Sequence, residues 1–223
     1  MALRLAPSPR APLHRIGWPP DPLAWPPRRY RGGGRFDDPK HQFGVLYVAD
    51  NLRACFLETL DPFRPDRALL QRLLTIGGEG FVPQSGLIPN GFFTRLIGTL
   101  RLEEDQRWLD LRAGAPDSAV ALSREPAIVT RLPELGYGKR FKPGDLVGSD
   151  RRLTQIVARW GYEHGYAGLA YSCSHDLRLD CWAVFEGAAF TAAAPPVPIE
   201  PDDPDLIAVA RAFELTLSFA DPT

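Results

Sequence analysis

The sequence has few of the features that mark exported, membrane-embedded or nucleic-acid-binding proteins. No stretch reaches the ~20 apolar residues of a transmembrane helix, and the first residues carry prolines and arginines where a signal peptide needs an unbroken apolar run. The net charge is −1 at pH 7, so the chain lacks the positive charge that holds a phosphate backbone non-specifically. We therefore expect a cytoplasmic protein that binds neither a membrane nor nucleic acid directly.

Cysteine and histidine are also scarce. The three cysteines, Cys55, Cys173 and Cys181, match no paired metal-ligand spacing, which favours free thiols in a reducing compartment over a disulfide framework. The four histidines are scattered, and none forms a pair at the helical spacing of metal ligands, so we expect no bound metal. His175 and Asp176 follow Cys173 too closely to orient a base toward a thiol nucleophile.

What the chain does contain is typical of one globular domain. It has 223 residues, of which 44% are apolar and 24% charged. Strand-like and helix-like segments follow one another without an internal repeat, so we predict an α+β fold with a single domain over residues 13–190. Residues 1–12 are predicted to be a flexible arm, and residues 191–223 a proline-rich linker with a short C-terminal helix over 205–217. The apolar positions of that helix could serve a partner or a homo-oligomer.

The best-defined local unit runs from Gly32 to Leu60. Its three glycines predict a turn, and the β-branched and aromatic residues of 43–49 predict a buried strand. Asp50 can cap the helix that follows, which ends at Asp61 because the next residue is a proline. Further along, residues 91–112 are predicted to form a β-hairpin. A second helix over 150–165, capped by Ser149, has one apolar face.

One carboxylate, Glu58, lies near the end of the first helix, which is otherwise mainly apolar. The residues three and four positions earlier are Cys55 and Ala54, so no basic side chain of the helix can pair with it there. A buried carboxylate is costly unless it is paired or hydrogen-bonded, which makes Glu58 a functional candidate. The alternative, which periodicity favours equally, is that the helix turns Glu58 to solvent. Tyr47 and Arg35 precede it. Taken alone, a tyrosine on a strand is typical of the core, and an arginine after a glycine run is typical of the surface.

The order of these residues resembles that of the RES domain family, which is named for its characteristic Arg, Glu and Ser. The matching segments are HRI at 14–16, GGRF at 33–36, GVLYVADNLRACFLETL at 44–60 and YSCSHDLRLDCWAVFE at 171–186. The resemblance implies a fold like that of ADP-ribosyltransferases, with mixed or antiparallel sheets and flanking helices. It also implies a bacterial type II toxin that degrades NAD and is neutralised by an antitoxin with an Xre-type helix-turn-helix.

The resemblance further implies roles for individual residues. Arg15 and Arg35 would lie in the NAD site, and Tyr47 would pack against the dinucleotide. Glu58 would be the catalytic carboxylate, with NAD as the substrate and no further cofactor.

The family's serine has three candidates here. The commonest form of the motif puts Cys173 at the serine position, with Ser172 and Ser174 on either side. We favour Ser172 because it directly follows Tyr171, and Cys173 and Ser174 remain the alternatives.

These residue types suit cleavage of the bond between nicotinamide and ribose. The reaction develops an oxocarbenium-like cation at the sugar, which a fixed carboxylate stabilises more in the transition state than in the ground state. Arginine pairs with pyrophosphate through its planar fork, and an aromatic ring offers a stacking face. We therefore expect an NAD glycohydrolase or phosphorylase. The alternatives are an ADP-ribosyltransferase that modifies a protein or small molecule, and a catalytically silent NAD-binding module.

Overall fold

The computed structural model describes residues 3–65, 72, 75–76, 86–146 and 150–217. Its centre is an eight-stranded sheet in the order β1-β6-β7-β8-β3-β2-β5-β9. The strands of this sheet are β1 (Leu5–Ala6), β2 (Leu13–Gly17), β3 (Val45–Ala49), β5 (Leu96–Leu102), β6 (Trp108–Asp110), β7 (Gly168–Ser172), β8 (Asp180–Phe185) and β9 (Phe190–Pro198). Every pairing in it is antiparallel except that of β6 with β7. The predicted α+β fold with a mixed sheet is confirmed.

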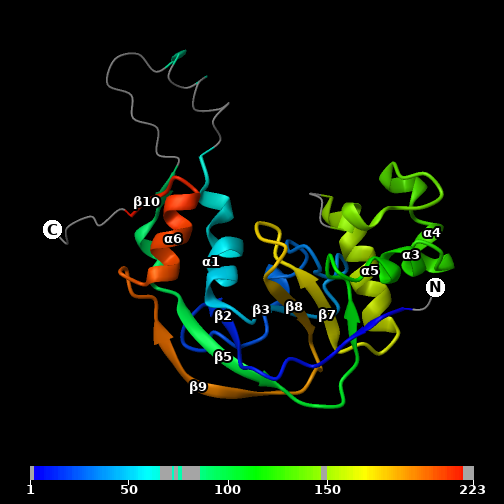
Figure 1. Ribbon diagram of the computed structural model, residues 1–223, viewed down its shortest axis with the longest axis horizontal. Coiled ribbons are helices and arrows are strands. Elements are labelled where there is room, and N and C mark those ends of the chain that lie inside the picture. The colour runs from blue at the N-terminus through cyan, green and yellow to red at the C-terminus, as the bar shows by residue number, and fades with distance from the viewer. Residues whose placement is uncertain (1–2, 66–71, 73–74, 77–85, 147–149, 218–223) are drawn as a thin grey trace.

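Two groups of helices pack on this sheet (Figure 1). The helices α1 (Leu52–Leu60) and α6 (Pro204–Ala212) lie side by side in one group, and α3 (Pro116–Leu122), α4 (Pro126–Val129) and α5 (Arg151–Glu163) form the other. A small parallel sheet joins β4 (Leu87–Ile88) to β10 (Thr216–Leu217) near α6. Within the described ranges, no helix is long and apolar enough to span a bilayer.

The central strands are buried on both faces, which explains their continuous apolar sequences. Along β8, Cys181, Ala183 and Phe185 face the larger core beneath the helices, whereas Trp182 and Val184 face a smaller core on the other side. This alternation follows from the two-residue period of a strand. Neighbouring residues of one strand therefore face different cores.

The two predicted helices form with small corrections to their caps. Asn51, and not Asp50, caps α1, because its side chain accepts a hydrogen bond from the Arg53 amide at 2.8 Å. The Asp50 amide instead donates to the carbonyl of Asp180 in β8. Asp150 caps α5 by accepting from the Arg152 amide, while Ser149 lies outside the described residues.

The prediction of a flexible N-terminal arm is wrong for the residues that the structure describes. Leu5 and Ala6 form β1, which pairs with Leu109 and Trp108 of β6, and the side chain of Ala6 is buried. The Arg4 amide donates to Ser118 Oγ at 3.1 Å. The nearby prolines limit the strand to two residues, but they do not prevent it from pairing at the edge of the sheet.

The prediction of a linker after residue 190 is also wrong. Residues 190–198 form β9, which pairs with β5 at the other edge of the sheet, where prolines are tolerated because one side needs no backbone donors. The C-terminal helix is α6, and it buries Leu206, Val209 and Ala210 within the same chain. The domain therefore continues past residue 190 to include β9 and α6.

The predicted hairpin over 91–112 contains two strands that do not pair with each other. β5 pairs with β2 and β9, whereas β6 pairs with β1 and β7. Local sequence signals identify two strands and a turn, but neighbouring strands in the sequence are not always neighbours in a sheet. This segment crosses from one half of the sheet to the other.

Candidate active site

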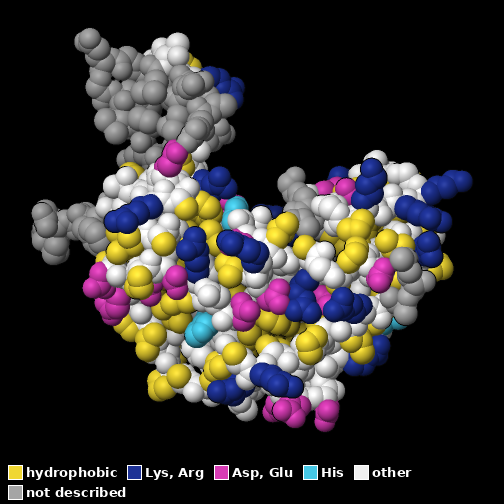
Figure 2. Space-filling view, in the orientation of Figure 1, with side chains coloured by type: hydrophobic (Ala, Val, Ile, Leu, Met, Phe, Trp, Pro, Cys, Tyr) yellow, Lys and Arg dark blue, Asp and Glu magenta, His cyan; other side chains and the backbone are white. Residues whose placement is uncertain are grey.

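A cavity of about 550 Å³ lies where α1, the loop after Gly32, the start of α5 and the turn between β7 and β8 meet. Figure 2 shows a hollow between the two lobes that these helices form, with Lys and Arg side chains along it. Its polar lining includes six residues of the family-motif segments: Arg15, Arg35, Tyr47, Glu58, Ser174 and His175. Segments far apart in the sequence therefore share one concave surface, which is the usual form of a small-molecule site.

Glu58 lies on the wall of this cavity and is half-buried. One of its carboxylate oxygens accepts a hydrogen bond from the backbone amide of Ser174 at 2.9 Å. The partner that α1 does not provide thus comes from the turn after β7. The alternative that the helix turns Glu58 away to solvent is wrong, because its side chain faces the cavity.

Ser174 connects Glu58 to an arginine. Its hydroxyl accepts a hydrogen bond from Arg35 Nη1 at 3.0 Å, while its amide donates to Glu58. Arginine, glutamate and serine side chains are therefore joined through one residue of the turn. Ser174 is the serine that lines the cavity among the described residues.

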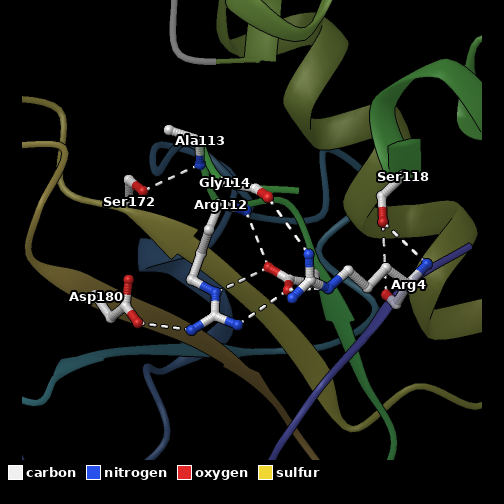
Figure 3. Close-up of polar contacts among 8 residues, drawn as sticks. Arg4, Arg112, Ala113, Gly114, Ser118, Ser172 and Asp180 are labelled. Atoms are coloured by element: carbon white, nitrogen blue, oxygen red, sulfur yellow. Dashed lines mark hydrogen bonds and ion pairs between the residues drawn. The ribbon is translucent and has the colours of Figure 1, made fainter. Parts of the chain in front are cut away.

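Ser172, which the sequence analysis favoured, does not line the cavity. It is buried, and its hydroxyl accepts from the Ala113 amide at 3.2 Å, as Figure 3 shows. The reason is the alternation along β7: Tyr171 faces the cavity, so Ser172 faces the opposite side of the sheet. The choice of Ser172 is corrected to Ser174, which lines the cavity. The strand-like sequence before the turn was the available signal, because neighbouring residues of a strand, such as Tyr171 and Ser172, face opposite sides of the sheet.

Ser172 instead belongs to an ion-paired cluster on the other face of the strands (Figure 3). Arg112 donates to both oxygens of the buried Asp110, at 2.8 and 2.9 Å, and to Asp180 at 2.6 Å. These hydrogen bonds, first among them those to Asp110, raise the pKa of Arg112 above its ordinary value. The cluster ties β6 to β8 and serves the fold.

Tyr47 lines the cavity, but its hydroxyl is fully engaged. It donates to Asp37 Oδ1 at 2.7 Å and accepts from the Phe36 amide at 2.8 Å. Burial, followed by the charge of Asp37, raises the pKa of Tyr47 well above its ordinary value. Asp37 also accepts from the Gly34 amide at 2.8 Å, so this pair of side chains holds the glycine turn in place. Sequence reasoning missed Asp37, which directly follows the GGRF segment.

Three arginines approach the cavity from different elements. Arg35 donates to the Leu146 carbonyl as well as to Ser174, and its buried Nε has no partner among the described residues. Arg15 donates to the Pro22 carbonyl, and burial lowers its pKa to about 10. Arg151, which the sequence analysis did not select, lines the cavity from the first turn of α5. Together they give the cavity a positive wall suited to an anionic ligand.

His175 and Asp61 lie on the same wall. His175 Nε2 is 3.2 Å from Asp61 Oδ1, and the imidazole also packs edge-on against Phe213 after α6. Neither residue was singled out for this site from the sequence. Asp61 directly follows α1 and His175 lies in the turn after β7, so tertiary packing brings them together and no local pattern indicates it.

Comparison with known proteins was made through family models, curated proteins and solved structures. The model of the RES domain matches residues 10–208, and no curated protein matches the chain. A chain in the crystal structure titled "M. tuberculosis MbcT-MbcA toxin-antitoxin complex" has the same fold, with a TM-score of 0.54 and 14% sequence identity over 95% of this chain and 93% of that one. The match of the family model over most of the sequence confirms the resemblance on which the residue roles were based. This chain belongs to the RES domain family.

Proposed function

We propose that this protein cleaves NAD at the bond between nicotinamide and ribose and acts as the toxin of a toxin-antitoxin pair. The observation that carries the proposal is the fixed Glu58 carboxylate on the wall of a cavity that also presents Arg15, Arg35 and Arg151. Membership of the RES domain family supports it. The fold likeness to a chain from a structure whose title describes a toxin-antitoxin complex agrees with it.

The cavity presents groups that suit the diphosphate and the aromatic rings of a dinucleotide. The diphosphate of NAD carries two negative charges, and guanidinium groups bind such oxygens by paired, charge-assisted hydrogen bonds. Arg35 Nε has no hydrogen-bond partner among the described residues, so its N–H is left to donate to a ligand. Tyr47 and Tyr171 add aromatic surface to the same lining.

The carboxylate supplies the chemical step. When the bond from ribose C1 to the nicotinamide nitrogen breaks, the electron pair leaves with nicotinamide and positive charge develops on the sugar. Glu58 is held by the Ser174 amide and does not have to reorganise to meet that charge. Water or phosphate then bonds to C1 and releases a proton, which completes hydrolysis or phosphorolysis.

A toxin that consumes NAD needs a partner that restrains it in the cytoplasm. We propose that this partner is a protein antitoxin with an Xre-type helix-turn-helix, encoded beside the toxin. Co-expression with that neighbour should suppress NAD loss and yield a complex that survives size-exclusion chromatography. NAD loss that continues unchanged, with no complex, would remove this part of the proposal.

The test is release of nicotinamide from NAD by the purified protein, measured with and without phosphate. Glu58→Gln should lower the rate by at least about 100-fold, the scale of losing one electrostatic contact to the transition state. Glu163→Gln is the matched control, because Glu163 lies on the exposed side of α5 and pairs with Arg159. Dependence on phosphate distinguishes phosphorolysis from hydrolysis.

Three other outcomes would contradict the proposal. Equal release by the wild type and Glu58→Gln would show that Glu58 is not catalytic. A labelled acceptor in place of free ADP-ribose would identify an ADP-ribosyltransferase. Binding of NAD by calorimetry without any release would identify a silent binding module.

A further inference from the structure

We infer that Glu58, Cys173 and Cys181 form a binding site for a thiophilic divalent metal ion such as Zn²⁺. One carboxylate oxygen and the two sulfur atoms lie within 4.8 Å of one another, although the residues are far apart in the sequence. Cys173 and Cys181 are almost fully buried, at 0% and 2% exposure, and Glu58 is half-buried beside them. The sequence predicted no metal because neither the spacing of the cysteines nor a lone glutamate on a helix indicates one.

The two strands explain how the sulfur atoms come together. Cys181 lies opposite Tyr171 in the pairing of β8 with β7, and Cys173 follows the last residue of β7, with its amide donating to the Leu179 carbonyl at 2.9 Å. Both side chains enter the core beneath the helices. α1 then places Glu58 against the same pair. The backbone therefore positions all three ligands before any ion binds.

The size of the cluster fits a tetrahedral ion. Zn–S bonds of about 2.3 Å and Zn–O bonds of about 2.0–2.2 Å require the ligand atoms to be about 3.5–4 Å apart. An upper limit of 4.8 Å leaves only a small contraction, which side-chain rotation can provide. Two sulfur atoms and one carboxylate oxygen are a donor set that favours Zn²⁺ or Cd²⁺ over Mg²⁺ or Ca²⁺.

The ion has a route to the cluster and a position for a fourth ligand. Glu58 and Cys181 both line the 550 Å³ cavity, so an ion can reach them without unfolding of the core. Glu58 can keep the Ser174 amide on one oxygen and bind the ion with the other. The fourth position then faces the cavity and can take water or an anion, as in zinc sites with three protein ligands.

The charge balance also allows the site. Binding releases the two thiol protons to solvent, so the ion and its three ligands carry a net charge of −1. The guanidinium of Arg35 lies nearby, because it donates to the hydroxyl of Ser174, the neighbour of Cys173. An unpaired buried charge would be costly, and this arginine offsets it.

Occupation of the site would remove the carboxylate from catalysis. This consequence rests on the proposed function, whereas binding of the metal does not. An ion on Glu58 neutralises the charge that would stabilise the sugar cation, so micromolar Zn²⁺ should inhibit nicotinamide release. The metal is thus expected to act as an inhibitor and not as a cofactor.

The test is titration of the full-length protein with Co²⁺ under a thiol-free reductant, followed by absorption spectroscopy. Tetrahedral thiolate coordination should produce an intense visible spectrum and a sulfur-to-metal charge-transfer band, saturating at one Co²⁺ per chain and bleached by Zn²⁺. Cys173→Ser and Cys181→Ser should each weaken binding by more than about 100-fold, because even residues behind the ligands contribute about 10- to 100-fold.

Cys55→Ser is the matched control. Cys55 lines the same cavity, but its thiol donates to the His14 carbonyl at 3.2 Å and lies outside the cluster. This variant should keep the full spectrum. Absence of the thiolate spectrum from the wild type, or its loss in Cys55→Ser but not in Cys173→Ser, would overturn the proposal.

A second variant and a second readout cover the case in which a cysteine variant does not fold. Glu58→Gln changes a residue at the cavity wall and should weaken Co²⁺ binding while the thiolate band shifts. Zn²⁺ should also raise the Tm of the wild type and Cys55→Ser, but not that of Glu58→Gln. If Co²⁺ binds as described but the metal-free protein releases no nicotinamide, the metal site stands and the proposed function fails.

Discussion

The two faces of strands β7 and β8 carry the same residue types in opposite roles. On one face, Arg112 donates to Asp110 and Asp180, and Ser172 accepts from a neighbouring amide. On the other face, Arg35 donates to the Ser174 hydroxyl and the Leu146 carbonyl, which are both uncharged, and Glu58 accepts from the Ser174 amide. The first arginine is ion-paired with two carboxylates, whereas the second, which lies beside a cavity, forms no ion pair with any described residue. Residue type alone does not mark a functional site; it is the charge left unpaired near an accessible space that does.

The largest expected effect is on stability, and it comes from breaking the ion-paired cluster around Arg112. Arg112→Met should destabilise the protein by about 3 kcal/mol, because Asp110, at 1% exposure, would lose two short hydrogen bonds and keep the longer 3.6 Å contact with the exposed Arg4. Urea denaturation measures this loss. Activity per folded molecule should change little, since Arg112 does not line the cavity.

Arg178→Met is the control for that experiment. Arg178 pairs with Asp176 at 2.8 Å, but its side chain is 88% exposed, so its removal should leave the urea midpoint nearly unchanged. If both variants were equally stable, the cluster around Arg112 would not be the structural element described here.

The next effect separates the two serines. Ser174→Ala removes the acceptor of Arg35 and should lower kcat/KM by about 10- to 100-fold, the value of a hydrogen bond to a charged group. Ser172→Ala leaves the Ala113 amide unpaired, so it should cost about 1 kcal/mol of stability and leave kcat/KM unchanged. Nicotinamide release and urea denaturation of both variants provide the comparison. The opposite pattern would return the functional role to Ser172.

The smallest effect concerns alkaline pH. Cys55 lies on the cavity side of the sheet, and burial raises its pKa to about 12. The folded protein therefore keeps a thiol proton that the unfolded chain loses near pH 9. The stability from this group is fully present below pH 9 and is lost as the pH rises toward 12. Because of this thiol, the free energy of unfolding of the wild type should fall by about 1 kcal/mol between pH 8 and pH 10, which urea denaturation can measure.

Cys55→Ala isolates this contribution. Its stability should fall less steeply with pH than that of the wild type over the same range. Arg112 on the other face stays charged throughout, because its pKa is raised, so its cluster adds nothing to the difference. Identical pH slopes for the two proteins would show that Cys55 ionises equally in the folded and unfolded states.

The sequence predicted the parts of the site that depend on local structure. The apolar residues of 43–49 form β3, and the helix after them is α1, so Tyr47 and Glu58 were correctly placed on a strand and on the following helix. The order of the Arg, Tyr and Glu residues along these elements also sufficed to indicate the RES domain family. Strand and helix periods are local properties, and they can be read from neighbouring residues.

The errors share one physical origin, which is pairing between distant segments. Residues 191–198 read as a linker because of their prolines, but the vacant edge of β5 pairs with them. The exact role of Ser172 depended on which face of β7 it occupied, and that face is defined by the helices that cover it. Asp37, Asp61 and Arg151 were missed because their partners lie on other elements.

By itself, the sequence determined the α+β class, the strand and helix that carry Tyr47 and Glu58, and the family. Only the tertiary structure decided that Ser174 links Arg35 to Glu58, that α6 completes the domain, and that two distant cysteines lie beside the same carboxylate. The reason is that backbone preference acts over a few residues, whereas a cavity is formed by side chains brought together through sheet pairing and burial. Chemistry at the site depends on those long-range contacts.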